Sequence, residues 1–160
     1  MRQNLGTALT VTATEKWLAA VQAGQAFSGI ANQAAVAAQF PHCQLFNPVG
    51  SGKTALVRAV LFQFTTASFF NVALDNVQRA TDVAAGVNLL NGGAAGVCHT
   101  RAESNAVAQG TPFAQFATLA NVTVLPPIEW WMQLAPGQGL DCVGTQVNTQ
   151  LFGTFMWIET

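Results

Sequence analysis

Apolar and polar residues alternate in two stretches of the chain, and this two-residue period is typical of β-strands. Within residues 42–46, Cys43 and Leu45 share one side, while their neighbours fall on the other. Residues 147–159 repeat the pattern. In this second stretch, the apolar residues that share one side of the strand are Val147, Leu151, Phe155 and Trp157. We predict a strand in each stretch, with Trp157 as an anchor of the hydrophobic core.

Further apolar segments also predict strands. Residues 54–65 carry β-branched and aromatic residues at both parities, which indicates a strand buried on both faces or nearly so. Residues 120–125 and 128–134 are apolar runs separated by two prolines, which donate no hydrogen bonds to a sheet. A turn over residues 136–139 then leads into a short strand at 140–143.

Helical patterns are short. Residues 14–22 fit a helix with Thr14 as its N-cap and Gly24 as its stop, although a strand is a competing interpretation. Residues 105–108 are a second candidate for a short helix, and residues 91–96 form a glycine-rich loop by composition.

Several short strands separated by turns predict a mainly β fold, an antiparallel β-sandwich or jelly roll with at most one or two short helices. A length of 160 residues suits one domain with its own core. We therefore expect a single sandwich domain over residues 1–160, in which residues 1–23 form an arm or a short helix.

Charged side chains make up only 8% of the chain, against about 25% in typical soluble domains. Gln, Asn and Thr together supply 40 residues, so the surface is expected to be polar but nearly uncharged. Six basic side chains form no run in the sequence, which argues against binding to nucleic acid or to a membrane surface. Few charges and a net charge of −1 favour association with copies of the chain or with a partner protein.

The sequence also bears on where the protein is made. No apolar run approaches the roughly 18 to 20 residues of a membrane-spanning helix. The first ten residues lack the apolar core of a signal peptide, so we expect synthesis and assembly in a cytoplasm.

The sequence GSGKT over residues 50–54 partly matches the phosphate-binding loop G-x-x-x-x-G-K-[ST]. Gly52, Lys53 and Thr54 match its end, but Asn47 stands where the motif needs its first glycine. Asp75, which follows an apolar run, is a candidate magnesium ligand, yet no alternation of strands and helices surrounds it.

We instead expect a turn in a hairpin-like unit, in which residues 47–53 join the strand at 42–46 to the strand at 54–65. Glycines supply the positive φ angles that a tight connection needs, and Pro after Asn ends a strand. The residues of this turn are Asn47, Pro48, Gly50 and Gly52. We predict no cofactor and no nucleotide site.

Two Cys-His pairs raise the question of a zinc site. His42-Cys43 and Cys98-His99 could supply four ligands, but adjacent residues on a strand point to opposite faces. Together with Cys142, the three cysteines fit neither a disulfide framework nor a C-x-x-C motif. We expect buried apolar cysteines, peripheral histidines and no metal.

Candidate catalytic and sugar-binding residues are few. Glu129 and Asp141 could act as the paired carboxylates of a glycosidase, and Ser104 lies near His99 and Glu103 without the G-x-S-x-G motif of a nucleophilic serine. The aromatic residues Trp130, Trp131 and Trp157 could form a platform on which a sugar stacks. No catalytic residue is predicted.

Two turns carry a resemblance to known proteins. The sequence Leu45-Phe-Asn-Pro-Val-Gly-Ser-Gly52 precedes an apolar strand, and Leu134-Ala-Pro-Gly137 leads to the terminal Trp157-Ile-Glu159. This arrangement resembles small structural proteins of tailed bacteriophages and prophages, loosely from Gly24 to Thr160. Lys53 departs from the apolar residue that often stands at its position in these proteins.

The resemblance implies a non-enzymatic β-sandwich subunit of the virion, assembled in the cytoplasm of a bacterial host. The leading interpretation is a capsid decoration or cement protein that binds the major capsid protein as a homo-oligomer, a trimer or another closed ring. A tail, fibre or receptor-binding component is the alternative in the same setting. A carbohydrate-binding module that uses Trp130 and Trp131, and a distant phosphate-loop enzyme, are alternatives from other classes.

Overall fold

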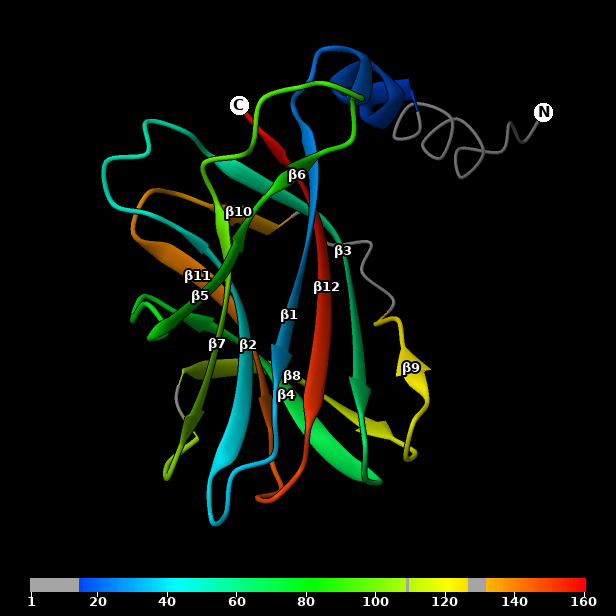
Figure 1. The fold of residues 1–160 in the computed structure, drawn as a ribbon, viewed down its shortest axis with the longest axis vertical. Helices are drawn as coiled ribbons and strands as arrows, with labels where there is room; N and C mark the ends of the chain where they lie inside the picture. Colours follow the sequence, from blue (N-terminus) through cyan, green and yellow to red (C-terminus); the bar gives the residue numbers. More distant parts are fainter. Residues whose placement is uncertain (1–14, 109, 127–131) are drawn as a thin grey trace, which may run out of the picture.

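A computed structural model describes residues 15–108, 110–126 and 132–160. The described residues form a short helix over residues 15–22 and twelve β-strands in two antiparallel sheets that pack face to face (Figure 1). The expected mainly β fold, an antiparallel β-sandwich, is confirmed.

The first sheet, sheet A, has the strand order β10-β3-β12-β1-β6, and β9 pairs with the far end of the same edge of β3. All of its pairs are antiparallel. Its strands are β1 (Ala26–Gln33), β3 (Ala55–Phe64), β6 (Val87–Asn88), β9 (Thr123–Val124), β10 (Met132–Leu134) and β12 (Leu151–Glu159).

The second sheet, sheet B, has the strand order β5-β7-β2-β11-β4-β8, again with antiparallel pairs throughout. Strand β11 lies between β2 and β4, so it is a central strand. The strands of sheet B are β2 (Phe40–Asn47), β4 (Ser68–Asp75), β5 (Thr81–Ala85), β7 (His99–Asn105), β8 (Thr111–Thr118) and β11 (Gln138–Gly144).

The core lies between the sheets and is rich in aromatic residues. Trp157 is fully buried and stacks on Phe27, while its indole Nε1 donates a hydrogen bond to Glu159 at 3.0 Å. This confirms Trp157 as a core anchor. Gly86 is required beside it, because a Cβ there would lie 2.4 Å from the indole ring. Further aromatic contacts link Phe62, Phe64, Phe70, Phe116 and Phe155.

The turn after Asn47 has the predicted backbone but not the predicted partners. Gly50 and Gly52 adopt φ angles of 78° and 65°, as expected. However, β2 belongs to sheet B and β3 to sheet A, so residues 47–53 cross between the sheets and form no hairpin. The Asn47 side chain fixes this crossing by donating to the carbonyls of Lys53 at 2.8 Å and Leu134 at 3.0 Å. The hairpin prediction is wrong because a two-residue period does not reveal which sheet a strand joins.

Strand β3 is buried mainly on one face. Its buried residues are Ala55, Val57, Val60, Phe62 and Phe64. The buried positions are odd-numbered up to Val57 and even-numbered from Val60. This change coincides with a β-bulge: Trp157 pairs with Val57 and Met156 with Ala59, so Arg58 is the extra residue. The other face is half-buried and none of its residues is exposed, so the prediction of burial on both faces or nearly so holds only in part, while the strand itself is confirmed.

Other predicted elements had mixed outcomes. The helix predicted at 14–22 is confirmed over residues 15–22, and its proposed N-cap Thr14 lies outside the described residues. The irregular loop at 91–96 is confirmed, whereas residues 105–108 form no helix. Strand β9 covers only two residues of the predicted strand at 120–125. Part of the predicted strand at 128–134 lies outside the described residues, and β10 is its final portion. The predicted strand at 147–159 begins only at β12, where the predicted alternation holds.

Candidate functional site

The charged side chains gather on the outer face of sheet B, the face opposite the core. Two of the six cationic residues, four of the seven acidic residues and both histidines belong to one network there. These residues are His42, Asp75, Arg79, Asp82, His99, Arg101, Glu103 and Asp141. A chain that is otherwise poor in charge therefore concentrates it in one region.

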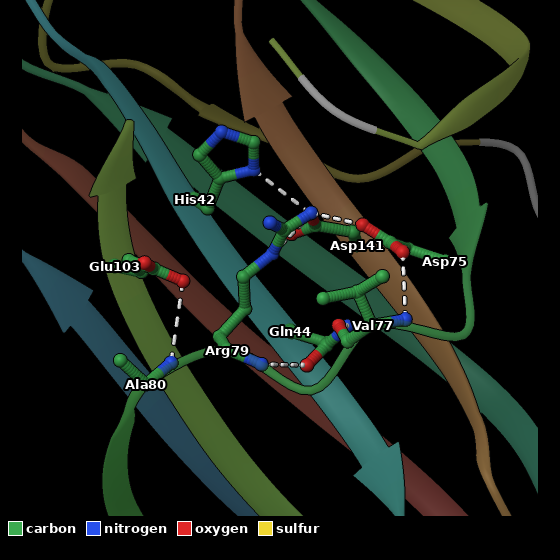
Figure 2. A network of polar contacts seen from close by, with 8 residues as sticks. All are labelled: His42, Gln44, Asp75, Val77, Arg79, Ala80, Glu103 and Asp141. Carbon is green, nitrogen blue, oxygen red and sulfur yellow. Dashed lines mark hydrogen bonds and ion pairs between the residues drawn. The ribbon is translucent and has the colours of Figure 1, made fainter. Parts of the chain in front are cut away.

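The network surrounds the connection between β4 and β5. These strands are not neighbours, because β11, β2 and β7 lie between them in sheet B. Residues 76–80, here called the strap, must therefore cross the outer faces of three strands (Figure 2). Arg79 points from the strap toward the sheet and is fully buried, whereas the other four strap residues are exposed.

Arg79 is the centre of the network. Its guanidinium contacts Asp75 at the end of β4 and Asp141 in β11, with 3.0 Å between Nε and Asp141 Oδ2. Both carboxylates are buried. Hydrogen-bonded ion pairs of this kind compensate the large cost of removing charges from water.

Gln44 holds the strap backbone from below. Its side-chain amide donates to the carbonyl of Val77 at 3.0 Å and accepts from the backbone N–H of Arg79 at 3.0 Å. Asp75 adds a local turn, because its Oδ1 accepts from the N–H of Val77 at 2.8 Å. Strap backbone groups that would otherwise lose water are thus satisfied by side chains.

The far end of the strap rests on β7. Arg101 donates from Nε to the carbonyl of Arg79 and from Nη2 to the carbonyl of Ala80, the latter at 3.1 Å. Glu103 accepts from the N–H of Ala80 at 3.2 Å. Arg101 also contacts Asp82 at 3.2 Å. The strap is therefore tied to sheet B along its length.

His42 completes the buried part of the network. Its Nδ1 lies 2.8 Å from Asp141 Oδ2, and both side chains are fully buried. Burial raises the pKa of Asp141, and the hydrogen bonds and charges of His42 and Arg79 oppose this rise without reversing it. His42 Nε2 and Asp141 Oδ1 have no hydrogen-bond partner among the described residues.

This arrangement resembles the His-Asp pair of an enzyme, but no serine hydroxyl or thiol of the described residues forms a hydrogen bond to His42. His42 and Asp141 have no exposed surface, and the Arg79 side chain reaches toward them from the strap (Figure 2). The Ser104 hydroxyl is buried and forms no hydrogen bond to any described residue, and His99 pairs with Asp82 instead. The geometry therefore suits holding a segment in place better than acid–base chemistry.

The candidate zinc ligands do not come together. No group of three or more His, Cys, Asp or Glu residues among the described residues is arranged to hold a metal ion. His42 faces the strap while Cys43 faces the core, as strand geometry requires. The three cysteines are free and buried as predicted. Burial raises the pKa of the thiols of Cys43, Cys98 and Cys142.

The other predictions about site residues are corrected by the structure or fall on residues outside the described ranges. His42 is fully buried and not peripheral, because it lies against Asp141, whose other contact is the buried Arg79 side chain from the strap. Asp75 and Asp141 bind Arg79, so they form a buried ion-pair cluster. Glu129, Trp130 and Trp131 lie outside the described residues.

The outer face of sheet A differs from this network. The helix covers one end of it, where Trp17 and Val21 pack near Ala26 and Ile158 (Figure 1). Beyond the helix, β3, β12 and β1 present three cross-strand rows of outward side chains, here called the neutral face. These rows are Ala59-Met156-Ser28, Leu61-Thr154-Ile30 and Gln63-Phe152-Asn32. None of the nine side chains is charged, and Ile30 is 64% exposed.

Across the described ranges 15–108, 110–126 and 132–160, no helix is long and apolar enough to cross a membrane. Comparison with protein-family models, with curated proteins and with solved structures gave no match for this chain.

Proposed function

We propose that the chain is a non-enzymatic structural subunit of a tailed-phage virion, which decorates the capsid shell as a homo-oligomer. The virion is its site of action, after assembly in the cytoplasm of the host bacterium. The sequence resemblance supports this proposal through the turn at residues 47–53, where Gly50 and Gly52 have the conformation that only glycine adopts readily.

The observation that carries the proposal is the neutral face. The nine positions of the neutral face expose Ile30 and Phe152 among Thr, Ser, Asn and Gln, so covering these positions removes no charge from water, and Arg58, the bulge residue next to Ala59, lies at their border. Interface centres are typically depleted of charged residues and enriched in aromatic residues and Met. The neutral face has this composition, so we assign it to contact between subunits.

The network on sheet B supports a structural role in a different way. Its hydrogen bonds and ion pairs hold the strap. The buried His42–Asp141 pair has no exposed surface that a substrate could contact. A rigid sandwich that bears one uncharged surface is suited to packing in an assembly.

The first test concerns association. We expect size-exclusion chromatography with light scattering to show an oligomer for the wild type and a monomer for Ile30→Glu, because the new carboxylate would be buried without a partner. Val49→Glu is the matched control, since Val49 is 83% exposed and lies in the crossing turn, away from the neutral face. A monomeric wild type, or an Ile30→Glu variant that stays oligomeric, would contradict the assignment of the neutral face.

The second test concerns the partner. Shells assembled from the major capsid protein of the same phage should co-sediment the wild-type protein and saturate at a fixed ratio. An oligomer that binds no shell but binds tail or fibre proteins would move the proposal to that part of the virion. The carbohydrate-binding alternative depends on Trp130 and Trp131, and no observation on the described residues favours it.

A further inference from the structure

The strap is held over a buried cluster whose charges do not balance. Arg79 contributes one positive charge, whereas Asp75 and Asp141 together contribute two negative charges when both are ionised. The side chains of Arg79 and Asp141 have no exposed surface and that of Asp75 only 6%. A net charge in such a place is costly, because little water remains to solvate it.

His42 offers the position at which the imbalance is removed. Its Nδ1 lies against the same Asp141 oxygen that Arg79 contacts. One proton held by the His42–Asp141 pair, on either partner, makes the cluster neutral. We propose that the strap is a proton-dependent latch, closed over sheet B while the His42–Asp141 pair holds one proton and released when that proton is lost.

The surroundings of the pair support this assignment. The elements packed near the His42–Asp141 pair contribute the following titratable or charged groups. These are His42 and the Cys43 thiol from β2, Arg79 from the strap, Asp75 from β4, the Cys142 thiol from β11, Arg101, Glu103 and His99 from β7, and Asp82 from β5. Asp82 and His99 at the far end of the strap are partly open to solvent, so water screens their charges, whereas the charge of the buried Arg101 is paired with Asp82. The unbalanced buried charge therefore lies at Asp141.

The sign of the pH effect follows from Asp141. Burial raises its pKa in the folded protein above the ordinary value of 3.8. A carboxyl group with a raised pKa stabilises the closed state most at low pH and loses this contribution as the pH rises through the folded value. Rising pH should therefore open the strap, in contrast to an ordinary exposed ion pair.

Three backbone amides report on the latch directly. The N–H groups of Val77, Arg79 and Ala80 donate to the side chains of Asp75, Gln44 and Glu103, so their exchange with deuterium requires the strap to open. We would measure protection factors, corrected for the intrinsic exchange rate, from about pH 5 to about pH 8. Amides of β12, in the other sheet, serve as the reference for global opening.

In the wild type, protection of these three amides should fall with rising pH, by up to about tenfold per pH unit for one linked proton. Protection in β12 should stay constant. In Asp141→Asn the cluster contains only Arg79 and Asp75, which balance without a proton, so protection should not depend on pH. Asp82→Asn, at the solvent-exposed end, should keep the wild-type slope.

Wild-type protection that is constant across the range overturns the proposal, whether or not the variants fold. It is also overturned if Asp141→Asn retains the slope or if Asp82→Asn abolishes it, since the proton would then reside elsewhere. The measurement needs no virion partner, so it stands or fails independently of the proposed function.

Discussion

The two outer faces of the sandwich use their polar residues for different purposes. On sheet B, Arg79, Asp75 and Asp141 are buried under the strap and contact one another. On sheet A, the neutral face carries no charged side chain and leaves Ile30 and Phe152 exposed. A chain with 8% charged residues therefore places much of its charge where a backbone segment needs partners.

The difference has a physical reason. A connection that crosses three strands of a sheet brings backbone N–H and C=O groups against a surface that excludes water, and these groups must be paired. Long side chains such as Gln44 and Arg101 provide the partners. No described segment crosses the three rows of the neutral face, so among these residues it needs only side chains that suit a half-buried pleated surface.

The largest effect should come from removing the centre of the network. Arg79→Ala leaves the carboxylates of Asp75 and Asp141 buried without their cation, which we expect to lower the free energy of unfolding by about 3 to 5 kcal/mol. Urea unfolding at neutral pH measures this change. Lys53→Ala, an exposed cation in the crossing turn, is the control and should change stability little. A loss below about 1 kcal/mol in Arg79→Ala would show that the cluster contributes no more than a surface pair does.

A glutamine on each face allows a matched comparison. Gln44→Leu leaves the Arg79 N–H and the Val77 carbonyl without a partner under the strap, at an expected cost of about 2 to 3 kcal/mol. Gln63→Leu makes the same substitution on the neutral face, where the side chain is only half-buried, and should change stability by less than about 0.5 kcal/mol. Equal effects in urea unfolding would mean that the two faces do not differ as described.

The crossing turn joins the two sheets and should respond to strain in its backbone. Gly50 has a φ angle of 78°, and no atom lies within 4 Å of a Cβ built there. Gly50→Val should therefore cost about 1 to 2 kcal/mol or more through backbone strain alone, measured as a lower thermal midpoint. Val49→Ala, the exposed neighbour, is the control. Unchanged stability in Gly50→Val would show that this turn does not require glycine.

The strands and the turn were accessible from the sequence because their signals are local. The parity of Cys43 and Leu45, and the glycines after Pro48, depend on residues a few positions apart. The pairing of β2 and β3 with different sheets was not accessible, since turn composition is the same for a hairpin and for a crossing. The bulge at Arg58 was also hidden, because it depends on the register with β12.

The candidate site was only partly accessible for a related reason. The sequence indicates Asp75 as a candidate magnesium ligand and Asp141 as a candidate catalytic carboxylate, but their common partner, Arg79, lies in a segment without a hydrophobic period. The alternation places His42 and Gln44 on the side of the strand opposite Cys43 and Leu45, and the structure confirms this because the latter two belong to the core. Their burial follows from the strap, which the alternation in β2 cannot reveal. The sequence signal that could have indicated this ion-pair cluster is an arginine, Arg79, that follows within a few residues an aspartate, Asp75, at the end of a strand.

The smallest effect should come from adding a charge to the neutral face. Thr154 lies in its central row between Leu61 and Ile30 and is half-buried, so a lysine there can extend its ammonium group into water. Thr154→Lys should change the free energy of unfolding of the monomer by less than about 1 kcal/mol, which is the span of strand propensities. Urea unfolding of dilute protein measures this change, beside Arg79→Ala. If the added charge destabilised the monomer as much as losing Arg79 does, the neutral face would be part of the fold's interior and could not serve as a surface for association.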